Sequence, residues 1–573
     1  MSKNLELAKT QIESKLKQAL KDCEAAGQLN RKPNPKQSAQ GADGPAFTLE
    51  VPADRAHGDW ACNAALVNAR TYGTAPRKIA DAVLGRLDLS GTFFDRCEVA
   101  GPGFLNFYYS PAFYTAVLRE IRENGERYGR SDFGGGKRVL VEFVSANPTG
   151  PMHIGNARGG AIGDCLSSVL DAAGYHVERE FYVNDAGNQI NKFAASLEAR
   201  YLQIYKGEDA VPFPEDGYKG ADIVAHAKHF AEQYGDQYVA STSEERRKAL
   251  VDFALPQNIE GLRRDLLKYR ISYDHWFRES TLHANGDVDR VVEGLKKRGA
   301  TYEKEGAVWF KGSEYGSEDF VLVRSNGVPT YVVPDIAYHY NKLVTRGFDK
   351  AIDVLGADHH GYVPRLKGAL KALGVDESRL DVLLMQMVRL VRNGEVIKAS
   401  KRSGKAITLV TLLEEVPVDA ARFFFNQREP NSELDFDLDL AVQQDSQNPV
   451  YYVQYAHARL CSLFKNLAAE GMTLRDCTDE ELALLRAPEE IALMRHLSTF
   501  AEEIVESAKH YDPARIPRYA VTLATLFHKF YTACRVKGEA DSLAAARLYL
   551  CDCTRTVLRN TLALLKISAP ESM

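Results

Sequence analysis

The chain has 573 residues, 45% of them apolar and 26% charged, which is ordinary for a folded protein, and at roughly 150 residues per domain it predicts about three to four units. Its formal net charge of −5 excludes a globally basic nucleic-acid binder, so any site for a polyanion has to be a local patch. No stretch approaches the roughly 18 consecutive apolar residues that a membrane span needs. The N-terminus is charged throughout, which argues against a secretory signal. Nine scattered cysteines without a CxxC pair indicate a reducing, cytoplasmic location.

The chain is expected to open with a small α+β domain over residues 1–112. Apolar residues recur at helical spacing over residues 2–22, which predicts an amphipathic helix: Leu5, Ala8, Ile12, Leu16 and Ala19. Residues 27–45 are rich in Gly, Pro, Asn and Lys and are typical of a loop. Strands are predicted near 46–51 and over 101–110. A linker over 113–137, ending in SDFGGGK, then leads to the next domain.

The middle of the chain, 138–420, has the pattern of an α/β domain. An apolar strand over 139–147 is followed by a helix over 155–173 and a second strand over 176–185, which together predict a doubly wound parallel sheet. From about 186 to 320 the pattern becomes helical and charged, then hairpin-like, as expected of an insertion. Further strands are predicted at 331–335, 351–358 and 381–391.

After a connecting segment over 421–447, residues 448–573 are predicted to be all-helical. Residues 509–573 hold ten Lys and Arg against five Asp and Glu. Aromatic residues are interleaved among them: Tyr511, Tyr519, Phe527, Phe530, Tyr531 and Tyr549. Cations for phosphates and aromatics for unstacked bases suit a single-stranded RNA loop, although most aromatics at such spacing belong to the core.

The helix of the first α/β unit begins with His153-Ile154-Gly155-Asn156. No GxGxxG and no GxxxxGK[ST] occurs, so a Rossmann dinucleotide site and a P-loop are both poorly supported. A helix N-terminus attracts anions, and Gly155 would let a flat base lie on the backbone. His153 is placed to donate a hydrogen bond to a phosphate in the transition state. Alone, such a histidine is as often a cap or a packing residue.

A basic segment follows the predicted strand 381–391. RNGEVIKASKRSGKAITL carries Lys398, Ser400, Lys401, Arg402 and Lys405, with glycines at 394 and 404. An isolated run of this kind is commonly a solvated loop. Because ligands bind at the carboxyl ends of strands in such sheets, this loop could instead neutralise a departing pyrophosphate.

Taken together, the two motifs resemble those of the class I aminoacyl-tRNA synthetases. His-Ile-Gly-Asn resembles their HIGH motif and Lys-Ala-Ser-Lys-Arg their KMSKS loop, in the same order. VEFVSANPTGPMHIGNARGGAIGD, DHHGYVPRLK, VDAARFF, LDFDLDLA and NPVYYVQYAHAR resemble the arginyl-tRNA synthetases over essentially the whole chain. Two departures stand out: Asn156 replaces the second His and cannot carry charge, and Ala399 replaces the Met.

The resemblance implies a Rossmann-like class I catalytic domain with an inserted domain, and ATP-dependent attachment of L-arginine to its cognate tRNA through an arginyl-adenylate. It implies charge stabilisation by His153, Asn156, Lys398 and Lys401. ATP with Mg²⁺ is expected to contact these residues together with Gly155, Asp358, His359 and Ser400. No tightly bound metal or organic cofactor is expected. The alternatives are a class I synthetase for another amino acid, a non-catalytic tRNA-binding relative, and a small-molecule nucleotidylyltransferase.

A guanidinium substrate needs carboxylates for bidentate pairing and an aromatic partner. Such groups are present as Glu142, Glu279, Tyr331 and Asp335. The resemblance places Tyr331 and Asp335 at the guanidinium, with Glu279 less surely assigned. It places Ser145 and Asn147 at the α-amino and carboxyl end, near His153. Glu142 could instead form a surface ion pair, and Asp335 could cap a helix.

For the tRNA, the resemblance assigns the anticodon arm to the C-terminal helical domain and the outer corner to the N-terminal domain. We expect contacts from Phe104, Asn106, Lys529, Arg535 and Lys537. The expected partners are the cognate arginine tRNA, L-arginine and ATP, with no membrane, and the chain is expected to be a monomer.

Overall fold

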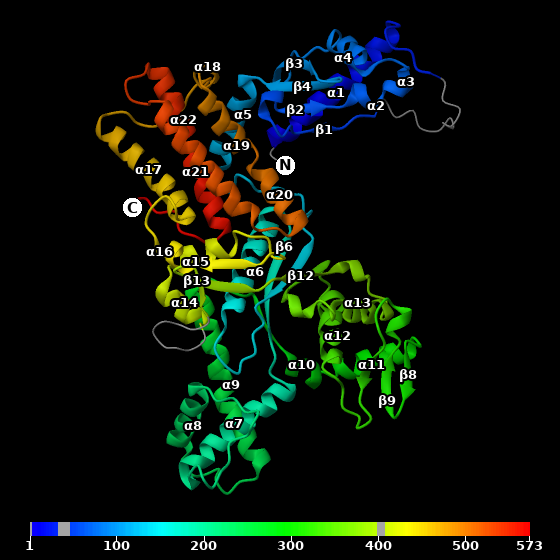
Figure 1. The fold of residues 1–573 in the computed structure, drawn as a ribbon, viewed down its shortest axis with the longest axis vertical. Helices are drawn as coiled ribbons and strands as arrows, with labels where there is room; N and C mark the ends of the chain where they lie inside the picture. Colours follow the sequence, from blue (N-terminus) through cyan, green and yellow to red (C-terminus); the bar gives the residue numbers. More distant parts are fainter. Residues whose placement is uncertain (1–2, 33–45, 398–406) are drawn as a thin grey trace.

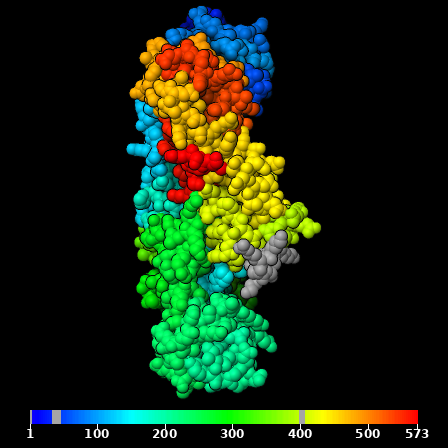
Figure 2. All heavy atoms as spheres, turned by 90° about the vertical axis from the view of Figure 1, so that its left-hand side faces the viewer, coloured from blue at the N-terminus to red at the C-terminus, as the bar shows by residue number. Residues whose placement is uncertain are grey.

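The computed structural model of the chain describes residues 3–32, 46–397 and 407–573. The molecule is elongated, with the N-terminal sheet near one end and a helical lobe at the other (Figure 1). Figure 2, turned by 90°, shows this lobe as a separate mass beyond the central domain. Among the described residues, no helix is long and apolar enough to cross a membrane.

The N-terminal domain packs its first helix, α1 (Lys3–Ala25), beside a four-stranded antiparallel sheet of order β1-β2-β4-β3. The five apolar residues that predicted this helix are all buried, which confirms its amphipathic face. The strands and further helices of this part are β1 (Leu49–Glu50), β2 (Trp60–Cys62), β3 (Phe94–Ala100), β4 (Phe104–Tyr109), α2 (Ala64–Val67), α3 (Ala69–Tyr72), α4 (Pro76–Leu84) and α5 (Pro111–Asn124).

The central sheet has five parallel strands in the order β12-β11-β5-β6-β7. They are β5 (Arg138–Phe143), β6 (His176–Val183), β7 (His275–Arg278), β11 (Lys350–Gly356) and β12 (Leu380–Met385). Side chains alternate between the two faces along each strand. Val141 and Phe143 belong to the core that includes α6 (Ile154–Ala172), so the intervening Glu142 points to the opposite face, where Lys342 contacts it. A parallel doubly wound sheet is thus confirmed.

Three local predictions differ from the structure. The predicted strand 331–335 is wrong: this segment opens α12 (Val332–Tyr340), a helix that tolerates Pro334 because first-turn N–H groups have no intrahelical acceptor. The predicted strand 381–391 is two strands, because the chain leaves the central sheet after Met385 and β13 (Val388–Arg392) pairs with β14 (Glu395–Ile397) and β15 (Leu434–Asp437). The expected insertion is interrupted by β7, which joins the central sheet.

The inserted material therefore forms two lobes. The first is the helical lobe of Figure 1: α7 (Gly187–Lys206), α8 (Ala221–Tyr234) and α9 (Ser243–Lys268). The second packs against α12 and α13 (Val363–Ala372) and contains α10 (Glu279–Ala284), α11 (Asp287–Lys297), β8 (Thr301–Lys304), β9 (Ala307–Phe310) and β10 (Phe320–Val323).

The C-terminal part is helical, as predicted. After α14 (Leu409–Glu415), α15 (Val418–Phe425) and α16 (Leu438–Val442) come α17 (Pro449–Ala469), α18 (Asp479–Leu482), α19 (Pro488–Ser498), α20 (Phe500–His510), α21 (Arg515–Ala533) and α22 (Asp541–Leu564). Arg422 is fully buried and donates to Asp164 on α6 and to the carbonyl of Leu565 just after α22. This arginine ties the last helix to the central domain.

Candidate active site

The first motif lies at the point where the central sheet divides. β5 has β6 on one side and β11 on the other, so the loops that follow β5 and β11 diverge at the carboxyl edge and leave a crevice there. The turn after β5 is strained, because Val144 and Ser145 have φ angles of 70° and 40°. Left-handed non-glycine residues of this kind concentrate at functional sites.

His153 and Asn156 form the start of α6. His153 is the N-cap residue, and its backbone N–H donates to Oδ1 of Asn156 at 3.0 Å. Asn156 therefore closes the first turn with its oxygen, and its amide N–H groups donate to no group among the described residues. An added Cβ at Gly155 would meet no atom within 4 Å, so the space above this residue is open, as a bound base requires.

The backbone joins the two motifs. His153 forms an isolated β-bridge with Thr408, and the N–H of Leu409 donates to the carbonyl of Met152 at 2.9 Å. The predicted phosphate residues Lys398, Ser400 and Lys401 lie outside the described residues. The chain that follows them is nonetheless fixed beside His153.

A cavity of about 730 Å³ lies over the first motif. Its wall comes from the loop after β5, the start of α6, the α7–α8 segment and the end of β11. Of the residues predicted to bind ATP or arginine, it is lined by Ser145, Asn147, His153, Gly155, Asn156 and His359. Asp358 is not part of this wall, and its side chain is 85% exposed.

Beside this cavity, three carboxylates converge from different elements. Glu142 ends β5, Glu279 follows β7, and Asp335 lies in the first turn of α12. Glu142 and Glu279 are buried at 6% and 8% exposure. Burial raises the pKa of Asp335 to about 6, and the negative charges of Glu279 and Glu142 add to that rise, against a hydrogen bond from Tyr362. The pocket is thus arranged for a cation.

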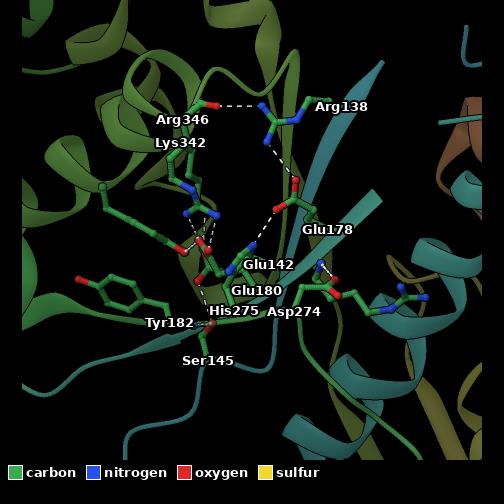
Figure 3. A network of polar contacts seen from close by, with 12 residues as sticks. Arg138, Glu142, Ser145, Glu178, Glu180, Tyr182, Asp274, His275, Lys342 and Arg346 are labelled. Carbon is green, nitrogen blue, oxygen red and sulfur yellow. Dashed lines mark hydrogen bonds and ion pairs between the residues drawn. The ribbon is translucent and has the colours of Figure 1, made fainter. Parts of the chain in front are cut away.

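Tyr182, at the end of β6, completes the wall of this pocket. Its hydroxyl is buried beside the carboxylate of Glu279, with which it interacts but makes no hydrogen bond of ordinary geometry among the described residues. Burial raises its pKa, and the nearby carboxylates of Glu279, Asp335 and Glu142 raise it further. Its backbone N–H donates to Oγ of Ser145, which in turn donates to Glu142 at 2.8 Å (Figure 3). A buried hydroxyl among carboxylates offers several acceptor oxygens, which suits a ligand with several N–H donors.

Tyr331 stands at the mouth of the pocket rather than inside it. It is the N-cap residue of α12 and is 69% exposed, with its ring stacked at 6.1 Å from Tyr362. The capping alternative for Asp335 is not supported, because Asp335 lies in the first turn of the helix and accepts from the Tyr362 hydroxyl at 2.6 Å. Tyr331 and Asp335 share one end of a helix, as their spacing allows.

Three polar residues of this region were missed in the sequence: Tyr182, His339 and Lys342. Asp335, His339 and Lys342 follow the i, i+4, i+7 spacing of one helix face, which is a detectable signal. This spacing was overlooked because Val332 and Val333 favour a strand at the start of the segment.

Some of the residues predicted to contact tRNA are exposed to solvent, and one of them is buried. Asn106 is only 3% exposed within β4, so its side chain is closed to RNA in this structure, whereas Phe104 is partly exposed. Lys529, Arg535 and Lys537 are all exposed, and Lys537 pairs with Glu470 at 2.6 Å. Most of the interleaved aromatics are core residues: Tyr519, Phe527, Phe530 and Tyr549.

A different aromatic surface lies between α17 and α21. Tyr455 is 40% exposed, with Tyr451 stacked beside it at 6.3 Å. Arg459 lies 4.1 Å above the ring of Tyr531, and His528 packs on Tyr452. Stacked rings with an arginine are what unstacked bases bind.

Comparison with known proteins gives one consistent result. Residues 10–109 match the arginyl tRNA synthetase N terminal domain, 118–457 the catalytic domain of the class I tRNA synthetases (R), and 453–573 the DALR anticodon binding domain. The arginine–tRNA ligase of Acetivibrio thermocellus is 54% identical over 542 residues, which are 94% of this chain and 96% of that protein. The arginine–tRNA ligase of Caldanaerobacter subterraneus is 53% identical over 574 residues and the full length of both chains.

Solved structures agree with these relatives. A Campylobacter jejuni arginyl-tRNA synthetase structure has a TM-score of 0.73 and 32% identity, covering 81% of this chain and all of that one. The Thermus thermophilus arginyl-tRNA synthetase also has a TM-score of 0.73, at 23% identity over 99% of this chain and all of that one, which supports the fold alone.

Proposed function

Since this chain belongs to the arginyl-tRNA synthetase family, we propose that the acidic pocket binds L-arginine and that the cavity at the start of α6 binds ATP with Mg²⁺. The chain is a ligase that charges tRNA with arginine, as its sequence predicted, and the alternative of another amino acid is set aside. The residues that perform the reaction are the subject of this proposal.

The observation that carries the pocket assignment is the convergence of Glu142, Glu279 and Asp335 around the buried hydroxyl of Tyr182. A guanidinium offers five N–H donors in a plane and one delocalised positive charge. It can therefore donate hydrogen bonds to these oxygens and supply the counter-charge that Glu279 and Asp335 need. Tyr331, exposed at the mouth, is placed to close over the bound side chain.

The arginine carboxylate then faces the first motif. In the first step, one of its oxygens attacks the α-phosphorus of ATP, the bond from that phosphorus to the bridging oxygen breaks, and pyrophosphate leaves. His153 and the amide N–H groups of Asn156 donate to the phosphate as negative charge grows. Lys398 and Lys401, outside the described residues, are assigned to the departing pyrophosphate by their place in the sequence.

In the second step, a ribose hydroxyl at the end of the tRNA attacks the carbonyl carbon of arginyl-adenylate. The new ester forms, AMP leaves, and the hydroxyl proton passes to solvent or to the departing phosphate. No protein side chain becomes a covalent nucleophile. The helical domain, through Lys529, Arg535, Lys537 and the surface around Tyr455, is proposed to hold the anticodon arm.

The proposal is tested by pyrophosphate exchange with arginine, in the presence and absence of its cognate tRNA. We expect weak exchange without tRNA and strong exchange with it, an expectation drawn from the family. Exchange supported by citrulline, which has arginine's shape without its charge, as well as by arginine would contradict the acidic-pocket assignment. Full exchange without tRNA would contradict the tRNA requirement alone.

Two wider expectations belong to the same proposal. A cytoplasmic location is supported by the nine cysteines, all of which are free thiols, seven of them buried. A monomer is expected, and sedimentation equilibrium would test it.

A further inference from the structure

Lys342 is a fully buried lysine beside the arginine pocket. The last turn of α12 passes into a π-helix, Asn341–Thr345, and this irregular turn carries Lys342. Single π-helical turns are frequent at functional sites. A buried ammonium is tolerated only when it is paired and hydrogen-bonded, so its partners define its role.

The partners of Lys342 are two carboxylates on neighbouring strands. Its Nζ lies 2.5 Å from Oε2 of Glu142 on β5 and 2.8 Å from Oδ1 of Asp353 on β11 (Figure 3 shows the Glu142 side). These contacts raise the pKa of Lys342 above its usual value despite burial, and they lower that of Asp353. The ammonium therefore bridges the adjacent strands β5 and β11 at a position where Glu142 and Asp353 are register partners.

The same chain of contacts reaches α12. Nε2 of His339 lies 2.6 Å from Oδ2 of Asp353, and Nδ1 of His339 lies 2.7 Å from the backbone carbonyl of Asp335. A carbonyl only accepts, and an ionised carboxylate only accepts, so this geometry is satisfied when the imidazole ring carries both protons. The cluster then holds two negative and two positive groups and is balanced internally.

Glu142 is held on its other side as well. Its Oε1 accepts from Oγ of Ser145, so both carboxylate oxygens are fixed by neighbouring groups. Glu142, His339 and Asp353 also have ligand atoms within 4.8 Å of one another, as a metal site would. The Lys342 ammonium is bonded to two of these three groups, so the chain itself supplies the cation of this cluster.

We propose that Lys342 is a positioning residue for arginine recognition, which fixes Glu142 directly and the Asp335 turn of α12 through Asp353 and His339. The cluster sets the spacing of two pocket carboxylates before arginine arrives, so that binding does not have to order them. This inference rests on the proposed assignment of Glu142 and Asp335 to the arginine pocket. The contribution of Lys342 is positional, because no substrate atom has to touch it.

The first test is Lys342→Met, which keeps the length of the side chain and removes its charge. We expect the arginine KM to rise about ten- to hundredfold, the size of effect that a displaced binding group produces. The ATP KM and the rate at saturating arginine should stay near wild type. The matched control is Arg346→Met on the same helical end, where Arg346 pairs with Glu180 at 2.6 Å and does not contact Glu142. The control should lower Tm without raising the arginine KM.

A second variant separates positioning from charge balance. Lys342→Met/Asp353→Asn removes one negative and one positive charge together, so Tm should recover relative to Lys342→Met even if the single variant folds poorly. The arginine KM should remain high, because Glu142 still lacks its anchor. The proposal is overturned if the arginine KM of the double variant returns to the wild-type value together with Tm. It is also overturned if Arg346→Met raises the arginine KM as much as Lys342→Met does, because Lys342 is then only a structural cation. An unchanged arginine KM in Asp335→Asn would instead refute the pocket assignment, and this proposal with it.

Discussion

Asp335 combines a functional requirement with a structural cost. The residue is half-buried, and desolvation of its carboxylate with Glu279 and Glu142 nearby raises its pKa to about 6, against the Tyr362 hydrogen bond and the charge of His339. Among the described residues, the two cationic groups of this region are already paired, Lys342 with Glu142 and Asp353, and His339 with Asp353. The free protein therefore carries a carboxylate whose charge is poorly compensated, and a bound guanidinium would relieve that cost.

Asp335→Asn should weaken arginine recognition and stabilise the free protein. Loss of a charge-assisted pair is expected to raise the arginine KM roughly ten- to a few hundredfold, with the ATP KM near wild type. Tm at pH 7.5 should rise, because the substitution removes a carboxylate that burial disfavours. Steady-state kinetics and thermal melting of the same sample check both effects. A fall of about 1 kcal/mol in stability with unaltered arginine kinetics would indicate a helix-capping role.

The same carboxylate predicts a pH dependence. Arginine binds the ionised form, so kcat/KM for arginine should fall about tenfold per pH unit below pH 6, since this ratio reports groups of the free enzyme. Because the folded pKa lies above the ordinary 3.8, the stability that Asp335 contributes is present below about pH 4 and is lost as the pH rises through 6. Measuring kcat/KM and Tm across a pH series for the wild type and Asp335→Asn checks both effects. If the fall in kcat/KM below pH 6 is unchanged in the variant, another group causes it.

At the scale of elements, α6 connects the two motifs. Arg158, one turn after the first motif, is fully buried and donates to four backbone carbonyls, of Gln386, Met387, Glu429 and Ser432. Those carbonyls lie on the segment that leaves the central sheet and on the turn before β15. The helix that opens with His153 thus also holds the sheet from which the second motif extends.

Arg158→Met should lower the free energy of unfolding by about 3 to 5 kcal/mol, because it leaves several buried carbonyls without a donor. Urea denaturation followed by circular dichroism measures the change. The matched control is Arg130→Met, whose exposed ion pair with Asp171 should contribute no more than about 1 kcal/mol. Equal effects in the two variants would show that the four contacts of Arg158 do not stabilise the junction.

The loop of the second motif leads to a prediction of its own, although it lies outside the described residues. Lys401→Ala should slow adenylation by about two orders of magnitude, the usual effect of removing one preorganised charge stabiliser. Arginine affinity should change little, since the loop is assigned to phosphate. Single-turnover adenylation and arginine titration separate the two, and lost arginine affinity with an unaltered chemical step would place the loop elsewhere.

The observed helices and strands differ in how well the sequence predicted them. Strongly periodic segments such as 155–173, and the apolar strand that carries Glu142, could be predicted because local pattern decides them, whereas β7, the strand before Glu279, was not predicted. The α12 helix could not, since Val332, Val333 and Pro334 have a strand-like local preference that tertiary packing overrides. Lys342 was hidden for a related reason: a lysine is normally exposed, and only the π-helical turn buries it. The proposed domain boundaries remain predictions.

At the scale of the whole molecule, the helices α17 to α22 lie on one side of the central domain and the lobe of α7 to α9 on the other (Figure 1). Asp59, on the N-terminal domain, pairs with Arg495 on α19 at 2.5 Å, and the N–H groups of Arg422 link α15 to the residues after α22. These contacts connect the domains, so one tRNA could bind the helical domain through its anticodon arm and reach the central sheet with its acceptor end. Affinity for tRNA and affinity for arginine should be separable by substitution.

The exposed cations of the helical domain provide that separation. Neutralising Lys529, Arg535 and Lys537 to Gln should weaken tRNA binding and flatten its salt dependence, because each lost phosphate contact lowers the logarithmic slope by about 0.7 to 0.9. Arginine and ATP binding should survive, since their proposed sites lie at the central sheet.

The matched control neutralises Lys296, Lys297 and Arg298, three exposed cations at the end of α11 in the second inserted lobe, which lies apart from α21 in Figure 1. Filter binding across a salt series measures both slopes. A wild-type slope in the first triple variant would show that these three residues face solvent, and the RNA surface would then be sought around Tyr455 and Arg459, on the aromatic face of α17.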